Sequence, residues 1–140
     1  DHGVMVAELY KKHFSPSGYL NEPKFNVALQ VVCAETSERA DFIASSRNIS
    51  RINTLKGIRE PLLSPEKASL IELTAHESQY LESVNKHMIQ GSPEMVKEQI
   101  LAAANAYGTT DVSIVTNCHY FEDRVRSYEL IADAFNLSHP

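Results

Sequence analysis

Polar side chains that could bind a ligand stand within and after two apolar stretches of the sequence. Asn26 and Gln30 alternate with apolar residues in the run KFNVALQVVCA, and Thr116, Asn117 and His119 close the run that starts at residue 111. Amide, hydroxyl and imidazole groups hydrogen-bond rings and small substrates. We therefore take these five residues as candidates for facing a substrate or cofactor. The alternative for each is an ordinary polar group of the interior or of a loop, which needs no ligand.

Motifs of catalysis and of metal binding are missing from the sequence. It has no GxSxG, no Walker loop, no GxGxxG and no HExxH pattern. His76 and His87 stand eleven residues apart, which is not a metal-ligand spacing. Gly91-Ser92 opens a predicted helix whose amino end could bind an anion, but helix capping alone explains this pair. The sequence therefore assigns no catalytic residue and no metal ligand.

The size and charge of the chain narrow the classes of partner. The 140 residues match one ordinary domain, and 43% apolar residues are enough for a core. The net charge is -5, and nucleic-acid binding draws on clustered cations, so we expect no nucleic-acid partner. The basic residues are scattered and are predicted to lie on solvated helix faces: Lys11, Lys12, Arg47, Arg51, Arg124 and Arg126.

The cysteines and the apolar runs indicate a cytoplasmic protein. Cys33 and Cys118 form no CxxC pair, and Cys33 lies in an apolar run as a small buried hydrophobe. This usage is typical of a reducing compartment. No stretch approaches the roughly 18 apolar residues of a membrane span, so we expect no membrane partner. The chain begins without Met or a signal-peptide pattern, which favours a processed or truncated piece.

Hydrophobic periodicity predicts alternating helices and strands. Capping residues mark two of the predicted helices: Thr36 or Ser37 begins the helix 37–55, and Ser92 and Gly108 flank the helix 93–107. A connection at 57–74 contains Ser64-Pro65-Glu66, which could open a short helical turn. The predicted helices are 2–14, 37–55, 75–87, 93–107 and 121–136, and the predicted strands are 24–34, 88–90 and 111–117.

This alternation predicts an α/β fold with a parallel sheet and helices outside it. In 24–34 the odd positions are all apolar and suit packing against helices, whereas the even positions, with Asn26 and Gln30, suit a face near a site. A closed (β/α)₈ barrel needs eight strands and about 250 residues. We therefore expect about the last three strand–helix units of a partial TIM-type barrel.

Three segments together resemble the C-terminal portion of the luciferase-like, flavin-dependent monooxygenases. They cover nearly the whole chain except 57–74, and the third includes RVRSYEL at 124–130. They resemble, in order, the family's helix and loop before the sixth strand, its sixth strand and following helix, and its seventh helix through its last helix. The segments are HGVMVAELYKKHFSPSGYLNEP, VALQVVCAETSERADFIASS and GSPEMVKEQILAAANAYGTTDVSIVTNCHYFEDRVRSYELIADAF.

The resemblance implies a chemistry for the parent protein. Such enzymes bind reduced FMN, let it react with O2, and direct the product at an aldehyde or another small organic substrate; relatives use the deazaflavin F420 instead. The flavin supplies the chemistry, and the protein supplies position and a dry pocket. The family's main flavin-phosphate contacts belong to the N-terminal part of the barrel. We therefore take residues 1–140 as a C-terminal segment that lacks that part.

Two expectations follow for the segment by itself. As an isolated piece it should be catalytically silent and bind FMN weakly or not at all. The alternative function is a self-associating, non-catalytic α/β module, because uncovered sheet edges would favour a homo-oligomer. The connection at 57–74 is either a lid over the site or a plain solvent-exposed loop.

Overall fold

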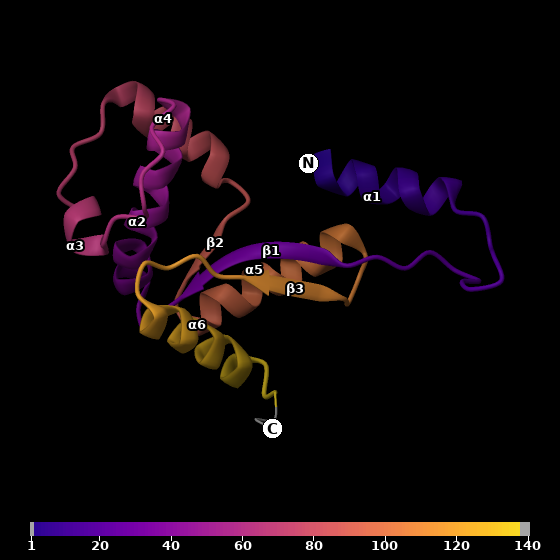
Figure 1. Ribbon diagram of the computed structural model, residues 1–140. Helices are drawn as coiled ribbons and strands as arrows, with labels where there is room; N and C mark the ends of the chain where they lie inside the picture. The colour runs from indigo at the N-terminus through magenta and orange to yellow at the C-terminus, as the bar shows by residue number, and fades with distance from the viewer. Residues whose placement is uncertain (1, 138–140) are drawn as a thin grey trace.

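The computed structural model describes residues 2–137, in which helices alternate with parallel strands (Figure 1). The boundaries agree with the predicted ones to within a few residues, and the predicted turn at Ser64-Pro65-Glu66 forms a short helix. The elements are α1 (His2–His13), β1 (Val27–Cys33), α2 (Ser37–Leu55), α3 (Pro65–Ala68), α4 (Ala75–Asn85), β2 (Ile89–Gly91), α5 (Pro93–Tyr107), β3 (Val112–Val115) and α6 (Phe121–Ala134).

The strands form an open three-stranded parallel sheet, and this corrects the expected fold. The strand order is β2-β1-β3, so β1 pairs with both other strands. In a barrel each strand pairs with the next along the chain, which would place β2 in the middle. The expected segment of a TIM-type barrel is therefore wrong for the described residues, because the crossover after β2 returns to the far side of β1. The chain forms a compact α/β unit instead.

Helices cover β1 on its two faces. Leu29, Val31 and Cys33 on the odd face form one core cluster with residues of α5 and α6 (Val96, Ile100, Leu130 and Ile131). Val32 and Ala34 on the even face pack against Ala40 and Ile43 of α2. Farther toward the amino end the even face is open, because Ala28 and its neighbours on β3 are exposed. The prediction that the odd face packs against helices is thus confirmed.

The caps predicted from the sequence set the ends of α2 and α5. The Thr36 hydroxyl accepts a hydrogen bond from the Arg39 backbone N–H, and Ser92 Oγ accepts one from the Met95 N–H. Gly108 ends α5 with φ at 63°, a left-handed conformation that glycine adopts without strain. Lys11 Nζ lies 2.7 Å from where a Cβ would stand on Gly108, so a side chain there would also require the end of the flexible Lys11 side chain to move.

Side chains of helix α6 accept hydrogen bonds from backbone N–H groups at the carboxyl ends of β1 and β3. The Ala34 N–H donates to Gly91 O on β2, so the Cys33 N–H points to the opposite side, beyond the end of β3. There the buried Ser127 Oγ of α6 accepts it at 2.9 Å. The Tyr128 hydroxyl likewise accepts the Thr116 N–H at 3.2 Å. Helix α6 therefore fixes where the carboxyl ends of β1 and β3 lie.

No helix within residues 2–137 is long and apolar enough to cross a membrane.

Helix α1 stands apart from the sheet (Figure 1), with only Ala7 of its residues buried. The Lys11 ammonium donates to Tyr107 O at 2.6 Å, which joins α1 to the carboxyl end of α5. A cation is favourable there because the helix dipole is negative at that end.

Replacing Ser127 by alanine is expected to destabilise the chain. The substitution leaves the buried Cys33 N–H without an acceptor, and an unsatisfied buried donor costs about 1–3 kcal/mol. Urea unfolding followed by circular dichroism measures the loss. Ser113→Ala, at an exposed serine of β3, is the matched control and should change the free energy of unfolding by about 0.5 kcal/mol or less. Equal losses in the two variants would contradict the role given to Ser127.

Candidate functional site

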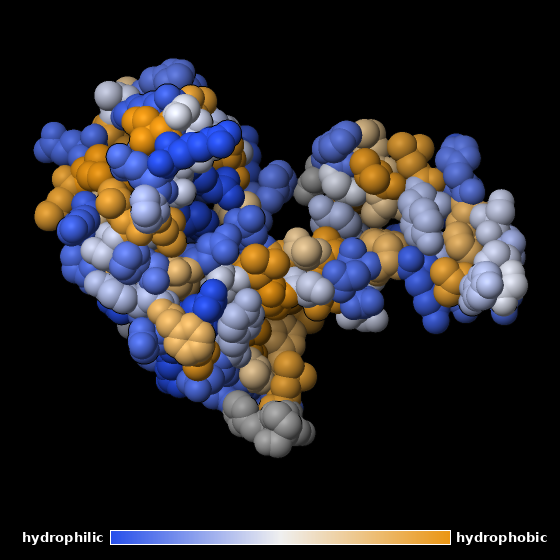
Figure 2. Space-filling model, in the orientation of Figure 1, coloured by the Kyte–Doolittle hydropathy of each residue, from blue (hydrophilic) through white to orange (hydrophobic). Residues whose placement is uncertain are grey.

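A polar pocket of about 410 Å³ lies where α2 passes the carboxyl ends of β1 and β3. Figure 2 shows hydrophilic residues gathering between α2 and the strands, beside apolar residues over β1 and β3. The pocket volume is within the range of small-molecule sites. Its lining residues are mostly polar or cationic, and no aspartate or glutamate is among them: Gln30, Arg47, Ser50, Arg51, Thr54, Leu62, Asn117, Cys118 and Arg124.

Two arginines reach the pocket from one face of α2. Arg47 and Arg51 are four residues apart, which places them one above the other on a helix. Arg51 donates to Gln30 Oε1 at 3.3 Å and to Val84 O at 3.3 Å. The third arginine, Arg124, comes from α6 and is exposed. Three positive charges from two helices therefore converge on one cavity.

Arg47 is the most buried of these cations, at 5% exposure. It donates to Gln90 Oε1 at 2.7 Å, and Gln90 Nε2 in turn donates to Asp41 Oδ1 at 2.6 Å. Burial, together with the positive charge of Arg51, lowers the pKa of Arg47 to about 10. The guanidinium is still charged at neutral pH, and its nearest acceptor is a neutral amide.

The structure brings part of the predicted site together. Gln30 and Asn117 both line the pocket. Thr116 is buried but does not line the pocket, and its hydroxyl has no hydrogen-bond partner among the described residues. His119 lines an adjoining hollow, with Nδ1 2.7 Å from Leu62 O of the 57–74 connection. Asn26 lies elsewhere, at the amino end of the sheet, where it donates to Asp111 Oδ1 at 2.7 Å.

The arginines were missed by the interpretation of the sequence. Scattered cations were expected on solvated faces, which is wrong for Arg47. A signal was present, because Arg47 follows Ala40, Ile43 and Ala44 at helical spacing and so continues the apolar stripe of α2. A cation on a buried stripe needs acceptors or a ligand. The convergence with Arg124 depends on packing between segments far apart in the chain.

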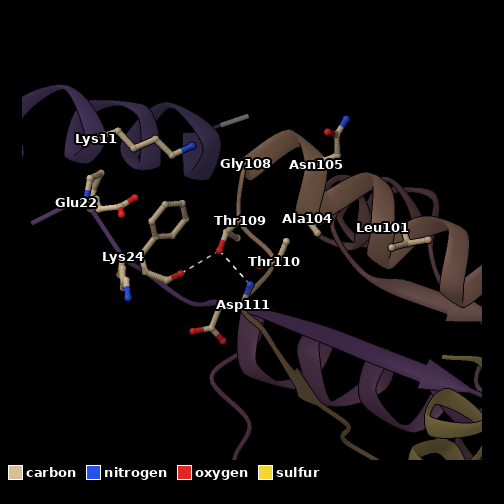
Figure 3. Close-up of a pocket in the computed structure, with 12 residues that line it drawn as sticks. Lys11, Glu22, Lys24, Leu101, Ala104, Asn105, Gly108, Thr109, Thr110 and Asp111 are labelled. Carbon is tan, nitrogen blue, oxygen red and sulfur yellow. Dashed lines mark hydrogen bonds between the residues drawn. The ribbon is translucent and has the colours of Figure 1, made fainter. Parts of the chain in front are cut away.

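A larger hollow lies at the opposite, amino end of the strands. It occupies about 830 Å³ between α1, the segment before β1 and the end of α5. Figure 3 shows Thr109 at its centre, accepting the Asp111 N–H and donating to Phe25 O, each at 3.1 Å. The Lys11 ammonium is engaged by Tyr107 O. These polar groups hydrogen-bond one another and hold neighbouring elements together. The hollow is therefore a weaker candidate for a ligand site than the pocket at the carboxyl ends of the strands.

The carboxyl-end pocket supplies positive charge and donors rather than a nucleophile. Burial raises the pKa of the Cys118 thiol to about 11, with a further rise from the Asp123 charge. Burial also raises the pKa of Cys33 to about 11. Neither thiol is activated, since an activated thiol needs a lowered pKa. Within residues 2–137 no three side chains of the metal-ligating types come together.

Comparison with known proteins gives relatives without an assigned activity. No family model matches the chain. It is 35% identical over 134 residues to the uncharacterized protein YwcH of Bacillus subtilis (strain 168), and 30% identical over 135 residues to the uncharacterized protein YceB of the same strain. These matches cover 95% and 96% of this chain but 40% and 41% of the relatives. The chain thus spans about two fifths of the length of the curated relatives it matches.

A solved structure has the same arrangement of helices and strands. The crystal structure of apo-MsnO8 matches all of this chain and 43% of its own, with a TM-score of 0.83 and 23% identity. At that identity the likeness concerns the fold alone. The α/β arrangement described above therefore occurs within a larger solved chain.

The two thiols are expected to react slowly in the folded chain. A free cysteine with a pKa near 8.5 is about one quarter thiolate at pH 8, whereas a pKa of about 11 leaves about 0.1%. Reaction with a disulfide reagent at pH 8 should therefore be at least about 100-fold slower than in urea. The rate should rise about tenfold per pH unit toward pH 11, because a raised pKa keeps the thiol protonated. One fast thiol in the native chain, lost in Cys118→Ser, would contradict this.

Proposed function

We propose that the chain forms one wall of the active site of a flavin-dependent, luciferase-like monooxygenase. The enzyme would use reduced FMN and O2 to oxidise an aldehyde or another small organic substrate in the cytoplasm. One observation carries the proposal: Gln30 of β1 and Asn117, which follows β3, line the same polar pocket. The three sequence segments that resemble this family support the activity, and the free cysteines support the location.

The described residues fit the polar part of a flavin better than its ring. The amides of Gln30 and Asn117 and the neighbouring guanidinium groups can hydrogen-bond polar atoms of a cofactor. The less polar side chains of the pocket are those of Leu62 and Cys118, too few to enclose a ring system. A flavin would supply the reaction with oxygen, while these residues would bind, orient and keep water away. The same donors also suit F420, which is the alternative cofactor.

The isolated 140-residue chain is expected to bind FMN weakly and to be inactive. Most of a flavin's contact surface would come from residues outside this chain, since relatives are more than twice as long. Quenching of FMN fluorescence on titration with the purified chain measures the affinity. Recovery of a yellow protein with one flavin per chain would contradict this expectation.

A chimaera tests the assignment to flavin chemistry. In it, this chain replaces the matching 134 residues of YwcH. We expect the chimaera to bind FMN and, with reduced FMN and O2, to convert an aldehyde to the carboxylic acid, with oxidised FMN and water as the other products. Asn117→Leu in the chimaera should weaken FMN binding about tenfold, the loss of one good hydrogen bond. Asn26→Leu, at the other end of the sheet, is the matched control and should leave it unchanged.

The second candidate function is self-association. Ala28, Ser113 and Val115 leave one face of the sheet open, and Val115 is 41% exposed. The outer edges of β2 and β3 carry no further strand within residues 2–137. Uncovered edges and apolar faces favour pairing with a second copy.

Light scattering at increasing concentration tests the self-association. The wild-type chain is expected to form a dimer, and Val115→Lys to shift it to monomer, because a charge would be buried in the contact. Leu70→Lys, at a residue that is 82% exposed in the 57–74 connection, is the control and should remain dimeric. A monomeric wild-type chain at high concentration would exclude this function while leaving the flavin proposal untouched.

A further inference from the structure

We propose that Arg47, Arg51 and Arg124 form a binding site for a small oxyanion, the phosphate or carboxylate group of a metabolite. All three line the cavity of about 410 Å³, and no acidic residue lines it. The chain as a whole has a net charge of -5, so the cavity is a local region of positive charge on a negatively charged protein. The site goes beyond the proposed function, because binding an anion requires neither flavin nor oxygen.

The strongest support is the burial of Arg47 without an anionic partner. Its side chain lines the cavity, and its guanidinium donates to the neutral amide oxygen of Gln90, which lies outside the cavity lining. The Nε atom is buried with no acceptor among the described residues. Taking a charged group out of water is costly unless it is paired and hydrogen-bonded. An oxyanion in the cavity would provide both the charge and the missing acceptor.

Two acidic residues of α2 and α6, Asp41 and Asp123, form hydrogen bonds to residues other than the cavity's arginines. Asp41 accepts a hydrogen bond from Gln90 and so reaches Arg47 only through that amide. Asp123 is paired with Arg39 through Oδ1 at 2.8 Å, while its buried Oδ2 has no hydrogen-bond partner among the described residues. Neither carboxylate lines the cavity. The three arginines of the cavity form no ion pair among the described residues, so their charges are available to a ligand.

The geometry suits a ligand of two negative charges. Arg47 and Arg51 project from successive turns of α2, and Arg124 approaches from α6. Planar guanidinium groups bind phosphate and carboxylate oxygens through two parallel hydrogen bonds. The positive charges of neighbouring guanidinium groups repel one another, and an anion bound between them offsets this repulsion because it attracts each of them. Ser50 and Asn117 add neutral donors to the same cavity. A phosphate monoester is expected to bind more tightly than a monocarboxylate.

A purely structural role for Arg47 is the competing explanation. The chain of hydrogen bonds from Arg47 through Gln90 to Asp41 ties β2 to α2 and could justify the arginine by itself. The two explanations differ in what a methionine at this position does. If the role is structural, its loss destabilises the chain. If the role is anion binding, removing an unpaired buried charge leaves stability unchanged or raises it.

Calorimetric titration of the 140-residue chain with inorganic phosphate, at constant ionic strength and neutral pH, tests the proposal. We expect saturable binding in the wild-type chain. Arg47→Met and Arg51→Met should each weaken it at least about tenfold. Arg59→Met, which removes an exposed arginine outside the cavity, is the matched control and should bind as the wild type does. Thermal unfolding without ligand should show Arg47→Met to be as stable as the wild type, or more so.

Two further ligands distinguish the sources of the oxyanion. Glycerol phosphate represents a phosphate monoester, and malonate represents a dicarboxylate. Tighter binding of either one, lost in Arg51→Met, supports the site and names the class of its ligand. The proposal is overturned if none of the three anions binds saturably, or if Arg59→Met weakens binding as much as the cavity variants do. Arg51→Met and Arg124→Gln decide the matter if Arg47→Met fails to fold, and no result depends on FMN.

Discussion

The central position of β1 is the constraint on which the rest of the structure depends. β1 pairs with β2 on one side and β3 on the other, and helices cover both faces of its carboxyl half. A strand buried in this way must be apolar on both faces, and the run Leu29–Ala34 meets this condition except at Gln30. The positions of α2, α5 and α6 follow, because each helix buries its apolar stripe against one face of this strand.

The packing of α2 against β1 also creates the conflict that marks the site. The stripe of α2 that covers β1 contains Ala40, Ile43 and Ala44 and then continues into Arg47. Packing the stripe therefore buries a charge. The Gln90 amide oxygen accepts a hydrogen bond from the Arg47 guanidinium, but Arg47 Nε has no acceptor among the described residues. Sequences depart from local consistency mainly at functional or strained positions, and this departure lies at the carboxyl ends of the strands.

Helix α6 connects the stability of the sheet to the shape of the pocket. Ser127 accepts the Cys33 N–H of β1 beyond the end of β3, and Tyr128 accepts the N–H of Thr116, which follows β3. The same helix presents Arg124 to the cavity, and the turn before it carries Asn117 and Cys118. A change that loosens α6 would therefore affect strand ends and site together, whereas changes in α1 would reach the pocket weakly, because α1 attaches at the other end of the sheet.

The sequence by itself determined the local structure. Period-2 and helical patterns, with caps at Thr36, Ser92 and Gly108, predicted every helix and strand to within a few residues, because these signals act between near neighbours in the chain. It also selected Gln30 in the middle of β1 and Asn117 just after β3, which line the same pocket. Only the tertiary structure decided the strand order, which replaced the expected barrel segment by an open sheet, and only packing brought Arg124 to Arg47 and Arg51. Both outcomes depend on contacts between distant segments, and no local pattern encodes which strand will stand beside which.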